Sequence, residues 1–557
     1  MRTLLLLSVL LLTFFAVSQS QVADAIFVNG KIWTVDKAKP SAEALAVLNG
    51  RILAVGSGSE IKKFAGAGTK VVDLKGKRVL PGFIDNHTHF MSGGFQLQSV
   101  DLRYAKSEAE FAALIKARAE KYPSRWITGG DWDHDNWPGG NLPTKELIDR
   151  YTQQIPVFVN RYDGHMALAN SYVLKLAGID KTTPDPQGGT IVRDKKTGEA
   201  TGVLKDAAMN LVYRHVPDPS EEEMLEAARL ALAEARKFGV TSIQDVSSGS
   251  DIRVYQILRD KGELTSRFHC RVPLSQWGNL AAVGIRVPFG DEWVRMGSLK
   301  EFADGSLGSS TALFFQPFTS DPGTRGLAMD VVLDGRLEKW AMDADKAGLQ
   351  LSIHAIGDSA NSLMLDLLEK ITKTNPAWDR RFRIEHAQHI ASKDFDRFAK
   401  LGVIASVQPY HAIDDGRWAE KRIGHERCRT TYPFRTFLDH GVKMCFGSDW
   451  TVGPLSPILG IYAAVTRRTT DGANPNGWFP EQKLTVAEAI EAYTINCAYA
   501  VFEEHEKGSI TPGKMADLVV LSDDILTIDP VKIEKVEVEM TVVSGKVVFE
   551  REGGGTK

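Results

Sequence analysis

Eight apolar runs, separated by stretches with helical spacing, are the feature of this sequence that most constrains its fold. The helical spacing is clear in residues 335–347, where apolar side chains recur at intervals of three and four before Gly348, a residue type favoured at helix ends. Repeated strand and helix units make a parallel sheet, and eight strands close a barrel. The runs cover residues 79–89, 240–247, 267–275, 296–304, 349–357, 381–388, 403–410 and 443–450. The sequence therefore predicts an α/β fold with a (β/α)8 TIM barrel.

The first run ends in Pro81-Gly-Phe-Ile-Asp-Asn-His-Thr-His89, which places one residue between two histidines. Residues i and i+2 of a strand point to the same side, so His87 and His89 can reach one cation. Imidazole nitrogens are common metal ligands. A pair of this kind also arises by chance, so its meaning depends on what the later runs supply.

Four further potential ligands lie near the C-terminal ends of later runs, namely Lys300, His354, His386 and Asp449. In (β/α)8 barrels the chemistry lies at the C-terminal ends of the strands, so these side chains would meet the first two at one mouth. Each histidine taken singly is more simply read as a hydrogen-bonded structural residue. Six candidates at successive strand ends favour a metal centre.

Four short motifs carry a resemblance to a known family: Lys300-Glu-Phe-Ala-Asp-Gly-Ser-Leu-Gly308, Arg383-Ile-Glu-His-Ala-Gln388, Ser406-Val-Gln-Pro409 and Gly447-Ser-Asp-Trp450. With the His87 and His89 motif they make the chain resemble the amidohydrolase superfamily, metal-dependent hydrolases built on a distorted (β/α)8 barrel. More narrowly, the chain resembles the branch that contains N-substituted formamide deformylases. The resemblance runs nearly from end to end and implies no particular substrate.

The resemblance implies a role for each candidate ligand. His87 and His89 would bind a first metal, His354 and His386 a second, and Asp449 the first metal while also carrying the proton. Lys300, neutral in a dry site, would add CO2 and bridge the metals as a carbamate. The cofactor would be zinc or another divalent metal, two per chain. If Lys300 instead pairs with a nearby carboxylate, Glu301 or Asp304, the site would hold one metal.

The function implied is hydrolysis of a non-peptide C–N bond, in an amide or formamide, by a metal-activated hydroxide. Asp449 would take the proton of the attacking water and deliver it to the leaving amine. Deaminases on similar barrels use a Glu three residues after the fifth-strand histidine, where this chain has Gly357. Two alternatives stay open: hydrolysis of cyclic amides, esters or lactones at the same site, and a catalytically silent binding relative.

A long insertion, at about residues 91–235, separates the first and second barrel strands, and such segments are often lids or subdomains. We expect it to cover the site. Within it His165 is a candidate for binding the substrate carbonyl or stabilising the oxyanion. The further candidates for substrate contact are Trp132, Gln408, Tyr410 and Trp450.

The two ends of the barrel chain, residues 21–80 and 508–557, predict one small β-sandwich domain beside a barrel of residues 81–507. Asn29-Gly30 and Asn49-Gly50 lie between strand-like runs and are strong signals for hairpin turns. The four cysteines do not form a disulfide framework in a chain of 557 residues, so we expect buried free thiols.

Residues 1–20 combine Arg2 with a short apolar stretch and small residues, the pattern of a cleavable signal peptide. We therefore expect a secreted or lumenal protein, periplasmic if bacterial, without a membrane span after cleavage. The 67 basic and 70 acidic residues are dispersed, which argues against nucleic-acid binding. The partner would be a small amide-like molecule, and the sequence leaves a homo-oligomer open.

Overall fold

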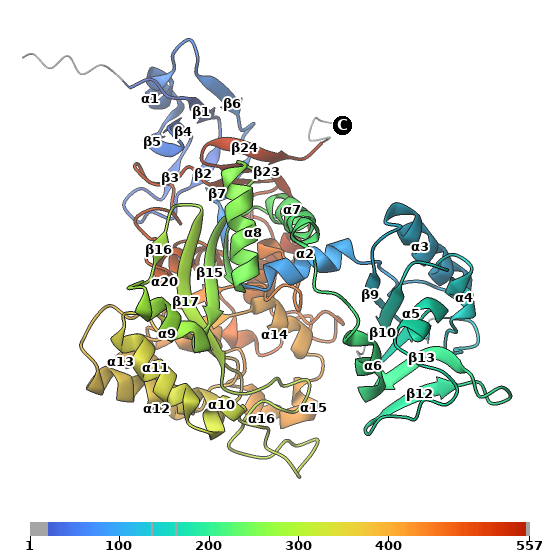
Figure 1. Ribbon diagram of the computed structural model, residues 1–557. Helices are drawn as coiled ribbons and strands as arrows, with labels where there is room; N and C mark the ends of the chain where they lie inside the picture. The colour runs from blue at the N-terminus through green and yellow to red at the C-terminus, as the bar shows by residue number, and fades with distance from the viewer. Residues whose placement is uncertain (1–20, 135–136, 162–164, 553–557) are drawn as a thin grey trace, which may run out of the picture.

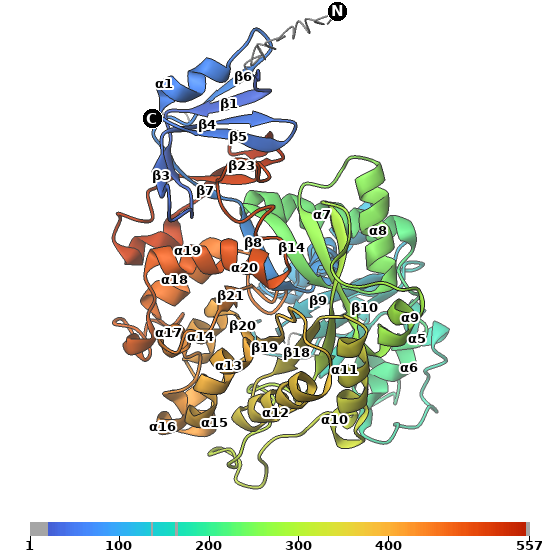
Figure 2. The ribbon, with the colours of Figure 1, turned by 90° about the vertical axis from the view of Figure 1, so that its left-hand side faces the viewer.

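The computed structural model describes residues 21–134, 137–161 and 165–552. Eight parallel strands follow the order β21-β20-β19-β18-β17-β15-β14-β8, and a bridge between Thr88 and Trp450 connects the two ends of this row. The strands are β8 (Phe83–Thr88), β14 (Val240–Val246), β15 (Arg267–Pro273), β17 (Val294–Phe302), β18 (Leu351–Ala355), β19 (Arg383–His386), β20 (Ile404–Val407) and β21 (Met444–Phe446). The predicted fold class is confirmed as a nearly closed, distorted barrel (Figure 2).

Helices between these strands and after the last of them cover the outside of the barrel. They include α7 (Glu221–Lys237), α8 (Gly249–Asp260), α11 (Arg336–Lys346), α12 (Asp358–Thr374), α13 (Phe395–Leu401), α17 (Phe434–Asp439), α18 (Pro457–Thr466) and α19 (Val486–Ala492). The local sequence explains where two of these helices begin or how they pack. Ser220 and Glu223 cap the backbone at the start of α7 reciprocally, and Leu337, Ala341 and Ala344 form the buried stripe of α11.

Both ends of the described chain contribute to two further sheets. One is β5-β4-β1-β6: Arg51–Gly56, Ala44–Leu48, Ala25–Val28 and Lys70–Asp73. The other is β24-β23-β22-β7-β2-β3: Lys546–Glu550, Val538–Val543, Leu518–Leu521, Arg78–Pro81, Lys31–Trp33 and Ser41–Ala42. Phe27, Leu45, Leu518 and Val542 share one core between the sheets, so early and late segments form a single packed body.

The two Asn-Gly signals have different outcomes. Asn49 and Gly50, with φ of 51° and 74°, join β4 to β5 in an antiparallel hairpin, as predicted. The prediction for Asn29 and Gly30 is wrong, because β1 pairs with β4 and β6 whereas β2 pairs with β3 and β7. A type I′ turn needs positive φ at both central residues, and of this pair only Asn29 has it, at 58°. The chain there crosses between the two sheets.

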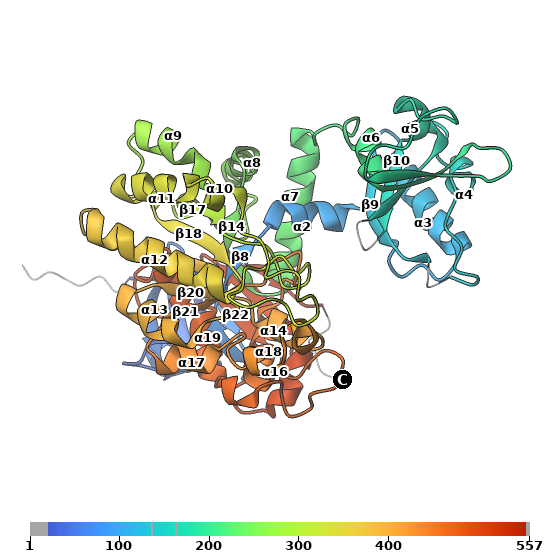
Figure 3. The same cartoon turned by 90° about the horizontal axis from the view of Figure 1, so that it is seen from below.

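The insertion forms its own sheet, β12-β13-β11-β10-β9, from Gly189–Arg193, Ala200–Asp206, Met166–Ala169, Val157–Arg161 and Ile127–Trp132. Helix α3 (Glu108–Lys121) packs on this sheet through Phe111 and Ile115. Helices α2 (Phe90–Gln98) and α7 connect it to the barrel. Figures 1 and 3 show the described part of the insertion beside the barrel and not over it.

None of the helices in the described ranges is at once long and apolar enough to cross a bilayer. The predicted signal peptide, residues 1–20, lies outside the described residues, as do residues 553–557. All four cysteines are buried free thiols, as predicted.

Candidate metal centre

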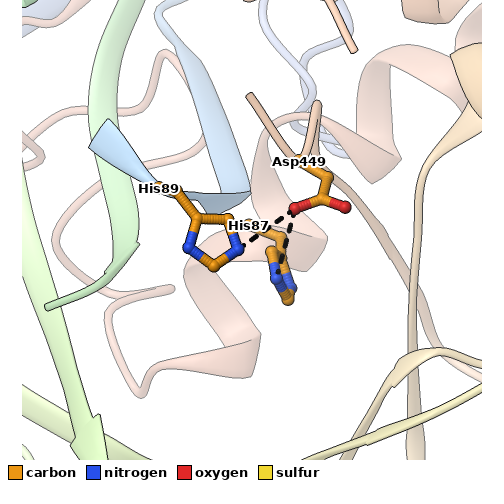
Figure 4. Close-up of side chains that lie close together, drawn as sticks. All are labelled: His87, His89 and Asp449. Atoms are coloured by element: carbon orange, nitrogen blue, oxygen red, sulfur yellow. Dashed lines mark ion pairs between the residues drawn. The ribbon is translucent and has the colours of Figure 1, made fainter. Parts of the chain in front are cut away.

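Strand β8 and the turn after β21 bring the first three predicted ligands together (Figure 4). An oxygen of Asp449 lies 3.7 Å from Nε2 of His87 and 3.4 Å from Nε2 of His89. The backbone N–H of Asp449 donates to the carbonyl of His87 over 2.7 Å, which ties the turn to the strand. His87 and His89 therefore point to one side of the strand end, as the i, i+2 spacing predicts.

The other three predicted ligands lie on neighbouring strands. The ring centroid of His386 is 5.0 Å from that of His87 and 4.4 Å from that of His354. Lys300, on β17, interacts electrostatically with Asp449, His354 and His386. The structure thus brings all six side chains to the C-terminal end of the barrel.

The backbone at two of these positions is strained. Asp449 has φ of 53° and His386 has φ of 71°, in the left-handed region that residues other than glycine rarely adopt. Such strain persists only where the surroundings impose it, and it concentrates at functional sites.

Burial gives these side chains the protonation states that metal ligands need. It lowers the pKa of His386 to about 4 and holds the pKa values of His87 and His354 well below the usual value, so all three imidazoles are neutral. Burial acts to raise the pKa of Asp449, but the adjacent His89 and the other neighbouring imidazoles outweigh it and lower the pKa. The carboxylate is therefore ionised.

Lys300 is the most unusual of the six. Burial lowers its pKa to about 7, and its Nζ lies 3.5 Å from the centroid of the Phe302 ring. The alternative of an ion pair with Glu301 or Asp304 does not occur among the described residues, because no carboxylate lies within 4.0 Å of Nζ. Asp304 instead accepts backbone hydrogen bonds from Leu313, Ile356 and Gly357.

Among the six candidate ligands, four buried atoms have no hydrogen-bond partner in the described residues: Nε2 of His87, Nζ of Lys300, Nδ1 of His354 and Oδ1 of Asp449. A buried polar atom without a partner is costly, and such atoms are rare in folded proteins. Nitrogen and carboxylate donors gathered in this way suit a divalent cation. The residues present therefore fit a metal ion.

A buried ion cluster of Arg271, Arg383 and Glu385 supports the ligands from below. Nδ1 of His87 donates to Glu385, whose carboxylate also lies 3.1 Å from Arg271 and 3.0 Å from Arg383. Burial acts to raise the pKa of Glu385, but the two guanidinium groups hold it well below its usual value. Nδ1 of His386 lies 2.9 Å from Oε1 of Gln408. A fixed second nitrogen orients each imidazole toward its metal.

The sequence interpretation missed Asp85 and Glu385, and its six-ligand pattern does not include His411. Asp85 is fully buried and accepts from the backbone N–H groups of His87 and Ser448, which fixes the strand end against the turn that carries Asp449. His411 belongs with His386 and Asp449 in a second group whose ligand atoms lie within 4.8 Å of one another. The carboxylates adjoin ligand motifs in the sequence, but their partners are distant in the chain.

The five predicted substrate contacts have different surroundings. Gln408 is buried against His386, and Tyr410 is partly buried on α14 (Pro409–Asp415). The structure corrects the expectation for Trp132, which is fully buried in the insertion core and donates its indole N–H to Val159.

Two further predicted contacts, Trp450 and His165, also differ from expectation. Trp450 is 6% exposed and packs against Phe90, so its ring serves the barrel core. Its carbonyl accepts from the backbone N–H of His89, which is its link to the site. His165 precedes β11 with its side chain 74% exposed, and its Nδ1 lies 2.9 Å from Asp206. His165 therefore belongs to the insertion, beside the barrel.

A nearly closed barrel with histidine and aspartate side chains gathered where its strands end is the architecture of a metal-dependent hydrolase. Residues 70–549 match the model of the Amidohydrolase family, and the chain belongs to that family. Among known proteins it is similar to Protein LONG AFTER FAR-RED 3 of Arabidopsis thaliana, 41% identical over 90% of this chain and 87% of that protein.

Two other proteins show how far the similarity extends. An N-substituted formamide deformylase of Arthrobacter pascens is 28% identical over 96% of this chain and 100% of its own length. A solved structure, an uncharacterized metal-dependent hydrolase of Pyrococcus horikoshii, superposes with a TM-score of 0.76 at 28% identity and covers 91% of this chain and 99% of that one. Barrel, insertion and terminal sheets thus all have counterparts in relatives.

Proposed function

We propose that this hydrolase cleaves the C–N bond of an N-acyl or N-formyl amide with water, releasing an acid and an amine. The observation that carries the proposal is the group of His87, His89 and Asp449, with unpartnered buried nitrogen and oxygen atoms facing one another at the barrel mouth. The relative named N-substituted formamide deformylase, similar along the whole chain, supports this choice of bond.

The site would hold two divalent ions, zinc for preference because its donors are mainly imidazoles. His87, His89 and Asp449 would bind the first, and His354 and His386 the second. Lys300, with its lowered pKa, would lose a proton, add CO2 and bridge the two as a carbamate. When bound, the metals would lower the pKa of a water and polarise the scissile carbonyl.

Asp449 is the group in this chain placed to move the proton. Its ionised carboxylate accepts a proton from water as the oxygen attacks the carbonyl carbon. When the C–N bond breaks, the same proton passes to the nitrogen and the amine leaves neutral. The backbone N–H of Asp449, which donates to the carbonyl of His87, keeps the residue at the strand end during both steps.

The chain lacks a carboxylate at the position where deaminases carry one, which supports amide hydrolysis over deamination. Gly357 stands three residues after His354, and a Cβ on it would approach the carbonyl oxygen of Leu313 to 2.0 Å. Neither Glu nor any other side chain fits there without moving the backbone.

The experiment is a metal assay joined to a substrate panel. Purified protein is analysed by inductively coupled plasma mass spectrometry, then tested on formamides, N-acyl amino acids and lactones. We expect about two zinc per chain and amine release from at least one formamide or acyl amide, abolished by chelation. The variant His87→Ala should lose both metal and activity, whereas a matched variant of an exposed histidine, His215→Ala, should keep them.

Cleavage of lactones alone would replace the amide proposal with the ester alternative. A protein without metal after reloading would refute hydrolysis, and about one metal per chain would refute the Lys300 bridge.

A further inference from the structure

His411 is a histidine at the barrel mouth that the six-ligand pattern does not use. It lies in the first turn of α14, just after β20, and its Nε2 is buried without a hydrogen-bond partner among the described residues. A ring nitrogen of His411 lies within 4.8 Å of ligand atoms of both His386 and Asp449. An unsatisfied donor atom therefore faces the same space as the candidate ligands.

Two neighbouring segments lie close to the ring of His411. On one side, a Cβ on Gly453 would lie 3.5 Å from Nε2, so the chain that follows Asp449 passes beside this nitrogen. On the other side, the buried carboxylate of Asp415, one helical turn later, interacts electrostatically with His411. Asp415 is itself fixed by Tyr432, at 2.6 Å, and by Gln388, at 3.0 Å.

His411 differs from three of the four candidate histidine ligands in how its ring is held. One ring nitrogen is engaged in His87, by Glu385, in His386, by Gln408, and in His354, by the Gly305 carbonyl at 3.1 Å. Such bonds leave the other nitrogen for a metal. Within the described residues no hydrogen bond fixes His411 in this way, and its helix begins beyond the end of the strand. This environment suits a group that contacts substrate better than a ligand.

We propose that His411 donates its Nε2–H to the carbonyl oxygen of the substrate, and that this hydrogen bond strengthens as the oxygen becomes an oxyanion. His411 is then a further catalytic residue, in the role that the sequence suggested for His165. The inference rests on the proposed amide hydrolysis. No proton leaves the imidazole in this step, and the charge that develops on the oxygen is stabilised where it forms.

Three substitutions of His411 test the assignment, because they differ in whether an N–H remains and in how far it reaches. His411→Leu removes both nitrogens, and loss of one oxyanion donor typically lowers kcat by about 100-fold to 1000-fold. The amide of Gln extends about as far as Nε2, and that of Asn about as far as Nδ1. We expect kcat to fall about 100-fold in His411→Leu and His411→Asn, but only about 10-fold in His411→Gln, with KM within about threefold throughout.

Metal content separates this role from that of a ligand. All three variants should keep the metal content of the wild type, and His215→Leu should match the wild type in every measurement. Loss of a metal equivalent from His411→Leu would make His411 a ligand and overturn the proposal. Equal kcat in wild type and His411→Leu, or equal losses in the Gln and Asn variants, would overturn it as well.

A binding assay keeps the test independent of the choice of substrate. Formate, a carboxylate of the kind that amide hydrolysis releases, is titrated into metal-loaded wild type and His411→Leu by calorimetry. We expect about tenfold weaker binding by the variant, since one hydrogen bond to a charged oxygen is lost. Unchanged formate affinity would overturn the assignment of His411, whether or not a panel substrate is cleaved. Failure to cleave any panel substrate would separately refute the proposed function.

Discussion

The barrel floor and the insertion differ in how firmly they hold the polar side chains that the sequence singles out. Below the candidate ligands, the buried ion cluster fixes His87 through side chains that are no more than 1% exposed. In the insertion, the side chain of His165 is 74% exposed and pairs with Asp206, whose side chain is 54% exposed. The difference indicates that the residues of the candidate metal centre all come from the barrel. The polar and aromatic side chains of the insertion mainly stabilise the insertion itself.

The sharpest test of the barrel side is removal of a ligand. His87→Ala deletes a nitrogen that faces Asp449 and leaves Glu385 without its imidazole. We expect kcat to fall at least about 10⁴-fold, the size seen when one member of a catalytic unit is removed. Steady-state kinetics and metal content measure this, with His215→Ala as the control. A loss below tenfold would remove His87 from the site.

The matching test of the insertion removes its largest buried side chain. Trp132→Ala empties a fully buried position and removes the indole N–H that donates to the Val159 carbonyl. We expect a loss of about 3–5 kcal/mol of stability in the insertion, with kcat per folded molecule unchanged. Urea unfolding followed by limited proteolysis measures the first quantity. Tyr104→Ala, at a side chain 71% exposed, is the control. A fall in kcat with intact folding would instead connect Trp132 to the substrate.

Glu385→Gln tests the support of the ligands without changing shape. Gln still accepts a hydrogen bond from His87 but lacks the charge that Arg271 and Arg383 face. We expect metal affinity to fall about 10–100-fold, as is usual when the partner of a ligating histidine is changed. Competition with a chelator of known affinity measures it, and Glu338→Gln at an exposed pair is the control. Equal affinities would mean that the buried ion cluster serves folding alone.

His389 makes the barrel side sensitive to acid. Burial lowers its pKa to about 3, and its Nδ1 lies 2.7 Å from the Thr431 hydroxyl. Because the unfolded state binds its proton near pH 6.5, stability is lost as pH falls from about 6.5 toward 3.

His389→Asn removes this titration while keeping a donor toward Thr431. Between pH 7 and pH 5 the wild type should lose about 2 kcal/mol more than the variant. Urea midpoints of both proteins at the two pH values measure the difference. Parallel losses in the two proteins would show that His389 is accessible to protons in the folded state.

The same contrast explains what the sequence could predict. Strand positions and the six candidate ligands follow from local patterns, since residues such as His354 and Asp449 end their own apolar runs and a barrel sends all strand ends to one mouth. Glu385 could not be paired with His87 from the sequence, because the two residues are 298 positions apart and meet only when the barrel forms.

The surroundings of the aromatic residues could not be predicted from the sequence either. Trp132 and Trp450 were expected to line a pocket, and both pack into hydrophobic cores. A tryptophan in a Gly-rich loop or beside a ligand has the same local pattern in either case. Only the position of the neighbouring elements, here Phe90 in α2 and Phe111 in α3, decides which occurs.

The smallest effect is expected for substitution of His165 in the insertion. A large effect there would contradict the contrast between barrel and insertion. His165→Ala removes an exposed imidazole whose pairing with Asp206 is of the surface kind, worth about 0–1 kcal/mol. We expect kcat/KM to change less than about threefold, and Asp206→Ala to behave alike. If kcat instead fell about 100-fold in His165→Ala but not in Asp206→Ala, His165 would act on the substrate itself. The insertion would then have to move against the barrel during turnover, and its position beside the mouth would be one of two states.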